Sequence, residues 1–157
     1  MDLGFIESKT YEEIAIGDTA STEHVLTTDD AMAFASISGF HAVLNSDEQT
    51  QRGGGVPPNG PNMWCASLIS GLFSMNTPGP GCTLTSVSLS FKNRIRVGDR
   101  ILVNVKVVAK DEATQKIIFD CEAKNGAGVP IFTGTADLLA PKQKVRWTTL
   151  PVPQLIV

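Results

Sequence analysis

The stretch Pro61–Met75, PNMWCASLISGLFSM, decides the fold because it is apolar on nearly every side of a predicted helix. The apolar residues that recur at helical spacing are Trp64, Ala66, Leu68, Ile69, Leu72 and Phe73. A proline suits the first helical turn, where its missing N–H costs nothing. A helix that is apolar all round is normally buried, so we expect this segment to lie inside the domain.

Strand patterns dominate the chain after the Pro78–Gly81 turn. Four segments have strand character: Thr83–Phe91, Ile101–Lys110, Lys116–Lys124 and Ile131–Leu139. Successive strands joined by short turns favour an antiparallel meander. The sequence therefore predicts one α+β domain over residues 1–157, in which a buried helix meets a long antiparallel sheet, and a proline-spaced surface tail over 141–157.

A second, shorter helix is predicted before the central one. Ser21–Leu26 has the β-branched residues of a short strand, and Thr27 follows it as a helix cap. Asp29 and Asp30 lie in the first turn, where acids complement the helix dipole. Gly39 is the expected residue just after the C-terminus of this helix.

Residues 40–60 lose all periodicity and include three consecutive glycines at 53–55. Connections of about 20 residues are usually functional or disordered. We therefore expect any chemistry to lie between Ser38 and Trp64.

Composition narrows the class of function. The formal net charge of −3 offers no basic field to a nucleic acid. The three cysteines form no C-x-x-C pair and lie far from the two histidines, so no metal site is expected. We expect reduced thiols, with Cys65 packed as a small hydrophobe. The N-terminus carries acids and no apolar run is long enough for a membrane span, which predicts a cytoplasmic protein.

A series of short motifs runs from Tyr11 to Pro141. They are Tyr11 with Ile16-Gly17-Asp18, Thr27-x-x-Asp30, Phe34-Ala35, Ser38-Gly39, Met63-Trp64, Leu68-Ile69-Ser70, Pro78-Gly79-Pro80-Gly81, Phe91, Gly98-Asp99 and Thr133-Gly134-Thr135-Ala136. In order and spacing this series resembles the MaoC-like enoyl-CoA hydratases and dehydratases. The resemblance implies the hot-dog fold, a long antiparallel sheet wrapped around a buried central helix. It also implies reversible, (R)-specific addition of water to a trans-2-enoyl thioester of coenzyme A or acyl carrier protein.

The chain departs from the family at the residues that activate the water. The family carries an aspartate and a histidine in an SGD-x-NP-x-H motif. Ser38 and Gly39 match, but Phe40 stands in place of the aspartate and Asn45 in place of the histidine. Asp47 matches again, so the alignment passes through the motif without a gap.

Two interpretations stay open for each candidate in this loop. His41, the one imidazole of the region, is either a displaced base or an ordinary loop histidine. Asn45 either positions a water or a substrate carbonyl or makes an Asx turn. We name His41 and Asn45 as the catalytic candidates, and Phe40 and Asp47 as substrate-binding candidates, although Asp47 also suits a local cap or turn.

The start of the central helix is the second candidate region. With Gly60 as cap and Pro61 at the first helical position, the backbone N–H groups of Asn62 and Met63 would be free to stabilise a thioester oxygen. The resemblance places Asn62 where the family has a glycine whose amide does this. Gly60, Asn62, Met63 and Trp64 complete the substrate-binding candidates. The alternative is an ordinary helix N-terminus.

Two functions from different classes follow. The first is an acyl-thioester hydratase or dehydratase with an altered loop and no cofactor other than the substrate's own carrier. The second is a catalytically inactive thioester-binding or structural subunit that partners an active hot-dog homologue. The resemblance implies a homodimer or a hetero-oligomer in both cases, because that fold usually joins sheets across a dimer.

Overall fold

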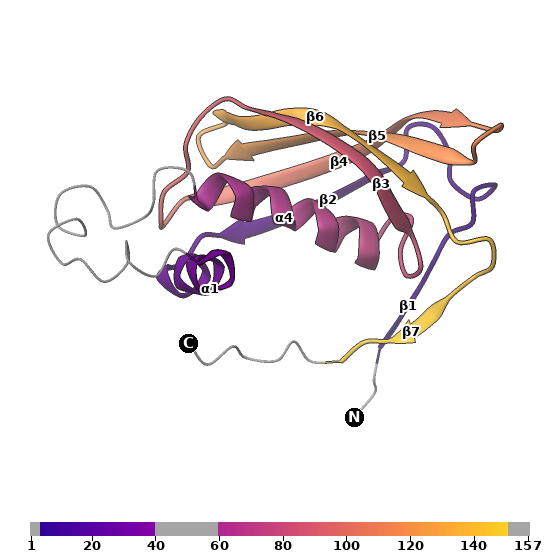
Figure 1. Cartoon of the computed structure of the whole chain (residues 1–157), viewed down its shortest axis with the longest axis horizontal. Coiled ribbons are helices and arrows are strands. Elements are labelled where there is room, and N and C mark those ends of the chain that lie inside the picture. The colour runs from indigo at the N-terminus through magenta and orange to yellow at the C-terminus, as the bar shows by residue number, and fades with distance from the viewer. Residues whose placement is uncertain (1–3, 40–59, 151–157) are drawn as a thin grey trace, which may run out of the picture.

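The structure, a computed structural model, describes residues 4–39 and 60–150. Its main strands are β2 (Thr19–Val25), β3 (Thr83–Phe91), β4 (Arg100–Asp111), β5 (Lys116–Asn125) and β6 (Pro130–Leu139), and its helices are α1 (Thr28–Ser38) and α4 (Gly60–Met75). The five strands form one antiparallel sheet in the order β2-β4-β5-β6-β3. The sheet curves over α4, and α1 lies beside β2 and α4 (Figure 1). The predicted strands and helices are therefore confirmed, with ends shifted by one or two residues.

The core lies between α4 and the concave face of the sheet. Ile101, Val103, Val105 and Val107 alternate along β4 and are at most 1% exposed. The α4 residues buried with the core are Trp64, Cys65, Ile69, Leu72 and Phe73. The opposite side of α4 is exposed at Met63, Ser67 and Ser70. The expectation that this helix is buried on all sides is therefore only partly correct, because the sheet covers only one side of α4.

The predicted meander is wrong for its first strand. β4, β5 and β6 are consecutive neighbours, but β3 pairs with β6 at the far edge of the sheet. The connection from β3 to β4 passes the N-terminal end of α4 instead of making a hairpin (Figure 1). Ile95 in this connection is only 3% exposed, so its burial holds the crossing segment against the core.

A small second sheet joins the two ends of the described chain. β1 (Phe5–Glu7) pairs antiparallel with β7 (Arg146–Thr148). Lys144 Nζ lies 3.0 Å from a Glu7 carboxylate oxygen and 3.2 Å from one of Glu13. The described part of the predicted surface tail is thus held by backbone pairing and by exposed ion pairs. Of the helices that the structure describes, none has both the length and the hydropathy that a membrane crossing requires.

Candidate functional site

The first turn of α4 differs from the prediction by one residue. Helix α4 begins at Gly60, so Gly60 is its first residue and not its cap. Met63 is then the fourth helical residue, and the first N–H groups of an α-helix have no partner within the helix. Asn62, at the third position, keeps its place among the N–H groups without an intrahelical partner. Asn62 and Met63 therefore both stay candidate oxyanion donors, in the first turn of α4.

The side chain of Asn62 holds this helix start in place. Its Nδ2 donates to the carbonyl oxygen of Asn93 at 3.1 Å, and its Oδ1 accepts from the Ile95 N–H at 3.3 Å. Both partners belong to the connection between β3 and β4. The two polar groups of the side chain are thus used structurally, which leaves the backbone N–H as the group that can meet a ligand.

Trp64 lies one residue beyond that turn and connects it to a histidine on β2. Its side chain is buried, 8% exposed, and its ring meets the ring of His24 edge to face at a centroid distance of 5.4 Å. His24 in turn places Nε2 3.1 Å from Asp30 Oδ2. Three elements, β2, α1 and α4, therefore meet at one titratable pair.

Asp30 is also the acidic half of the cap of α1. Thr27 Oγ1 accepts from the Asp30 N–H, and Asp30 Oδ2 accepts from the Thr27 N–H at 3.0 Å and from Thr27 Oγ1 at 2.7 Å. Burial raises the pKa of Asp30, but the hydrogen bonds from Thr27 and His24 outweigh it and leave the pKa lowered. Asp30 is therefore ionised at neutral pH and held in one place.

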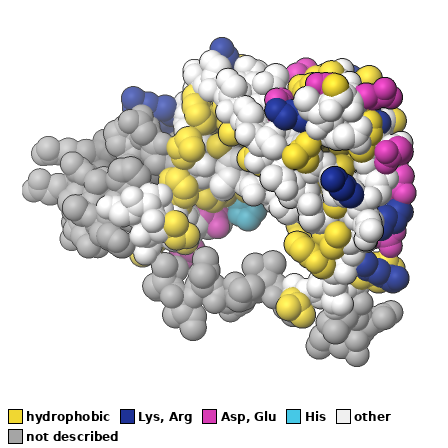
Figure 2. Space-filling model, turned by 45° about the vertical axis from the view of Figure 1, so that its right-hand side comes forward, with side chains coloured by type: hydrophobic (Ala, Val, Ile, Leu, Met, Phe, Trp, Pro, Cys, Tyr) yellow, Lys and Arg dark blue, Asp and Glu magenta, His cyan; other side chains and the backbone are white. Residues whose placement is uncertain are grey.

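The His24–Asp30 pair is open to solvent. The side chain of His24 is 47% exposed and that of Asp30 is 28% exposed. In the space-filling view a histidine and an acidic side chain lie near each other at the surface, with hydrophobic side chains in the same region (Figure 2). A small ligand can therefore reach the pair.

The sequence-predicted loop residues lie outside the described residues: Phe40, His41, Asn45 and Asp47. Of the other predicted residues, Asn62 contacts the β3–β4 connection and Trp64 contacts β2. The side chain of Met63 is 55% exposed.

Sequence reasoning missed His24. The available signal was its spacing of six residues before Asp30, across a strand end and a helix cap. Neither a strand nor a helix pattern predicts that these two residues meet, because the chain changes from strand to helix between them.

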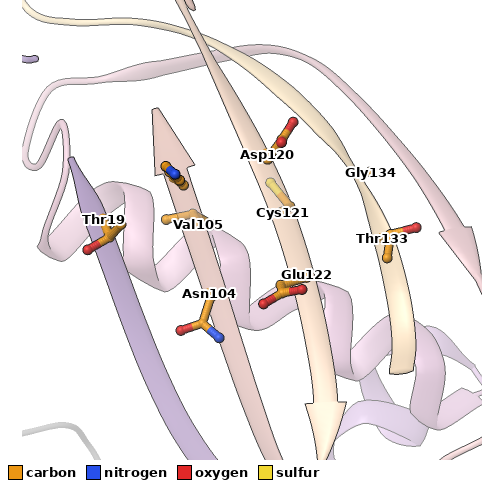
Figure 3. Close-up of a pocket in the computed structure, with 9 residues that line it drawn as sticks. Thr19, Asn104, Val105, Asp120, Cys121, Glu122, Thr133 and Gly134 are labelled. Carbon is orange, nitrogen blue, oxygen red and sulfur yellow. The ribbon is translucent and has the colours of Figure 1, made fainter. Parts of the chain in front are cut away.

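Other polar groups offer less. Among the described residues, no group of three or more His, Cys, Asp and Glu side chains is placed to hold a metal ion. A hollow of about 640 Å³ lies on the face of the sheet that points away from α4 (Figure 3). It is lined by Thr19, Asn104, Val105, Lys106, Asp120, Cys121, Glu122, Thr133 and Gly134. Because the sheet separates it from the start of α4, this hollow is not part of the candidate site.

Comparison with known proteins finds acyl-thioester dehydratases and a hydratase among the curated relatives. No protein-family model matches the chain. A 3-hydroxybutyryl-CoA dehydratase of Methylorubrum extorquens is 25% identical over 138 residues, which cover 85% of each chain. The two differ in most residues but align over most of their length.

Solved structures show a similar fold. The R-hydratase PhaJ1 of Pseudomonas aeruginosa superposes with a TM-score of 0.86 at 22% identity, covering 98% of this chain and 99% of that one. An (R)-hydratase of A. caviae involved in PHA biosynthesis superposes at 0.73 with 27% identity, covering 83% and 99%. The predicted hot-dog fold is therefore confirmed, and over most of its length the chain is similar to hydratases and dehydratases of the MaoC-like kind.

Proposed function

We propose that this protein hydrates trans-2-enoyl thioesters of coenzyme A or acyl carrier protein, and catalyses the reverse dehydration. The observation that carries the proposal is the similarity, over 85% of both chains, to a 3-hydroxybutyryl-CoA dehydratase. Adding water to a conjugated double bond is redox-neutral and uses only the thioester and water. The proposal therefore includes no cofactor beyond the carrier of the acyl group.

The start of α4 supports a carbonyl-binding role. When water adds to the β-carbon of an enoyl thioester, negative charge develops on the thioester oxygen. A backbone N–H at the positive end of a helix stabilises such charge, and one oxyanion-hole donor contributes about 2.7–4 kcal/mol in known enzymes. The Asn62 N–H is in this position, and the bonds of its side chain to Asn93 and Ile95 keep it there.

A second function has its own supporting observation. Phe40 and Asn45 stand where the family carries its aspartate and histidine, so the usual pair that activates water is missing. This favours an inactive subunit that binds the thioester, or serves a structural role, beside an active homologue. His41 and Asn45 stay proposed as replacement catalytic residues in the first function. Phe40, Asp47, Gly60, Asn62, Met63 and Trp64 stay proposed as substrate-binding residues.

One assay separates the two functions. Purified protein is mixed with crotonyl-CoA, and the absorbance of the conjugated thioester is followed. The hydratase predicts a catalytic decrease in absorbance, and His41→Ala reports whether the loop histidine contributes. No turnover together with measurable acyl-CoA binding would favour the inactive subunit. Neither turnover nor binding would contradict both.

We also propose that two copies pair through β3. Its sequence, TLTSVSLSF, carries no charge, and β3 is an edge of the sheet in the described structure. Edge strands usually carry charges or prolines that block pairing with another chain, and β3 has neither. Val87 and Phe91 on this strand are 49% and 39% exposed, so a second copy would cover them.

A cytoplasmic location is part of the proposal. Cys65, Cys82 and Cys121 are all free thiols. Free thiols are typical of a reducing compartment.

A further inference from the structure

His24 combines three properties that a proton-transferring residue needs. Its side chain is 47% exposed, so a substrate can reach it. Its ring packs edge to face on Trp64, a buried residue of α4, at 5.4 Å between centroids. Its Nε2 lies 3.1 Å from Asp30 Oδ2. The ring is thus fixed by an aromatic contact and a carboxylate while one of its edges stays accessible.

The carboxylate settles which ring nitrogen carries the proton. An ionised carboxylate only accepts hydrogen bonds, so Nε2 of His24 must donate its hydrogen to Asp30. In the neutral imidazole the lone pair then lies on Nδ1. Among the residues that the structure describes, Nδ1 makes no hydrogen bond. It is therefore free to accept a proton from a water molecule.

Asp30 is well suited to stabilise the imidazolium that would result. The Thr27 N–H and Thr27 Oγ1 both donate to the carboxylate oxygen that faces His24. A carboxylate held in this way orients the ring, as in other histidine–carboxylate pairs. Among the described residues, Asp30 from α1 and the uncharged Trp64 from α4 contact the ring of His24.

We propose that His24 is the acid–base residue of this protein, with Asp30 as its positioning residue, so that a histidine–aspartate pair on β2 and α1 replaces the pair missing from the loop. The inference rests on the proposed function.

The chemistry balances without a further reactant. Nδ1 takes a proton from water, the water oxygen bonds to the β-carbon, and the electrons of the double bond move to the thioester oxygen as an enolate. The imidazolium returns the proton to the α-carbon as the thioester carbonyl re-forms. Dehydration is the reverse sequence.

The competing explanation is structural, because Asp30 also caps α1 and His24 could simply extend the cap. Thr27→Ala separates the two roles: it removes the capping hydroxyl but leaves the contact between His24 and Asp30. Glu23→Gln is the matched control on the same strand. Glu23 is also in an ion pair, with Arg100, and points to the opposite face of β2.

The test measures crotonyl-CoA hydration by wild type, His24→Gln, His24→Ala, Asp30→Asn, Thr27→Ala, Glu23→Gln and His41→Ala, with thermal unfolding of each. General acid–base help is worth about 10²–10⁴-fold, so we expect His24→Gln to lower kcat by at least about 100-fold with little change in KM. Asp30→Asn should lower kcat more than Thr27→Ala does. Thr27→Ala should mainly lower the unfolding temperature. Added imidazole should restore part of the activity of His24→Ala, which a structural role would not allow.

The inference is overturned if wild type is active and His24→Gln keeps its kcat, or if His41→Ala alone abolishes turnover. The proposed function survives both of these outcomes. Wild-type protein without hydration activity would overturn the proposed function and this inference together. If His24→Gln does not fold, the comparison of Asp30→Asn with Thr27→Ala decides, because equal losses of kcat would contradict the inference.

Discussion

Gly134 lies in the middle of β6, opposite Leu89 of β3 and Cys121 of β5. A Cβ added here would collide with the carbonyl oxygen of Ser88 and would lie 2.9 Å from Leu89 Cα. Both are backbone atoms of a paired strand, so neither can move aside cheaply. A glycine inside a strand often marks such a close approach, which explains its place in the Thr133–Ala136 motif.

We therefore expect Gly134→Ala to lower the free energy of unfolding by about 1–3 kcal/mol, the usual range for overpacking. Urea denaturation measures this. Thr133→Ala is the control, because Thr133 is exposed on the same strand and exposed positions usually change stability by less than about 0.5 kcal/mol. If Gly134→Ala is as stable as wild type, the close packing of β3 on β6 is contradicted.

Burial should make the three cysteine thiols slow to react in the folded protein. Burial raises the pKa of Cys65 to about 12, and burial with the nearby Asp120 raises that of Cys121 to about 12. Burial also raises the pKa of Cys82, whose Sγ donates to the Phe73 carbonyl at 3.3 Å. The thiolate is the reactive form.

We expect a thiol reagent to modify Cys65 and Cys121 slowly at pH 8 in the native protein, since a thiol of pKa about 12 is ionised to about one part in 10⁴ there. All three cysteines should react quickly in denaturant. Rapid native modification of Cys65 would contradict its assignment as a packed core residue.

At the scale of elements, the cap of α1 is the feature that responds most directly to mutation. Thr27→Ala removes the hydroxyl that accepts from the Asp30 N–H and donates to its carboxylate. Loss of an N-cap side chain costs about 0.5–2 kcal/mol. We expect a loss of this size at pH 7, measured by urea denaturation.

The size of that loss should depend on pH. The pKa of Asp30 is lowered in the folded protein from its ordinary value of 3.8. Its carboxylate therefore contributes stability that is present above the ordinary value and is lost as the pH falls through the lowered one. The difference in stability between wild type and Thr27→Ala should shrink when it is measured at pH 3. A difference that stays constant from pH 7 to pH 3 would show that the carboxylate takes no part in the cap.

These elements differ in how far the sequence predicts them. Local signals suffice for α1, where Thr27, Asp30 and Gly39 define both ends, and for the alternating strands. The position of β3 depends on a crossing over the end of α4 that no local pattern contains, so the predicted meander failed there. The His24–Asp30 pair was missed for the same reason, since it is made by packing β2 against α1. The hydrogen bonds from the Asn62 side chain to Asn93 and Ile95 also join residues more than 30 positions apart, which no local pattern predicts.

For the molecule as a whole, the edge strand β3 predicts the assembly. Val87→Lys places a charge on an exposed position of an otherwise uncharged edge, and edge lysines oppose strand pairing. We expect wild type to have the mass of two chains in light scattering and Val87→Lys the mass of one. Ser21→Lys, on the opposite edge strand β2, should leave the dimer intact. A dimer that survives Val87→Lys unchanged would place the interface elsewhere.

The reaction itself has a stereochemical signature. Incubation with crotonyl-CoA, followed by chiral separation of the 3-hydroxybutyryl-CoA formed, measures turnover and configuration in a single experiment. A MaoC-like hydratase with one acid–base pair on one side of the substrate should form the (R)-product only, and wild-type protein should dehydrate (R)-3-hydroxybutyryl-CoA but not the (S)-isomer. Absence of product at enzyme concentrations that bind acyl-CoA, or a racemic product, would contradict the proposed hydratase.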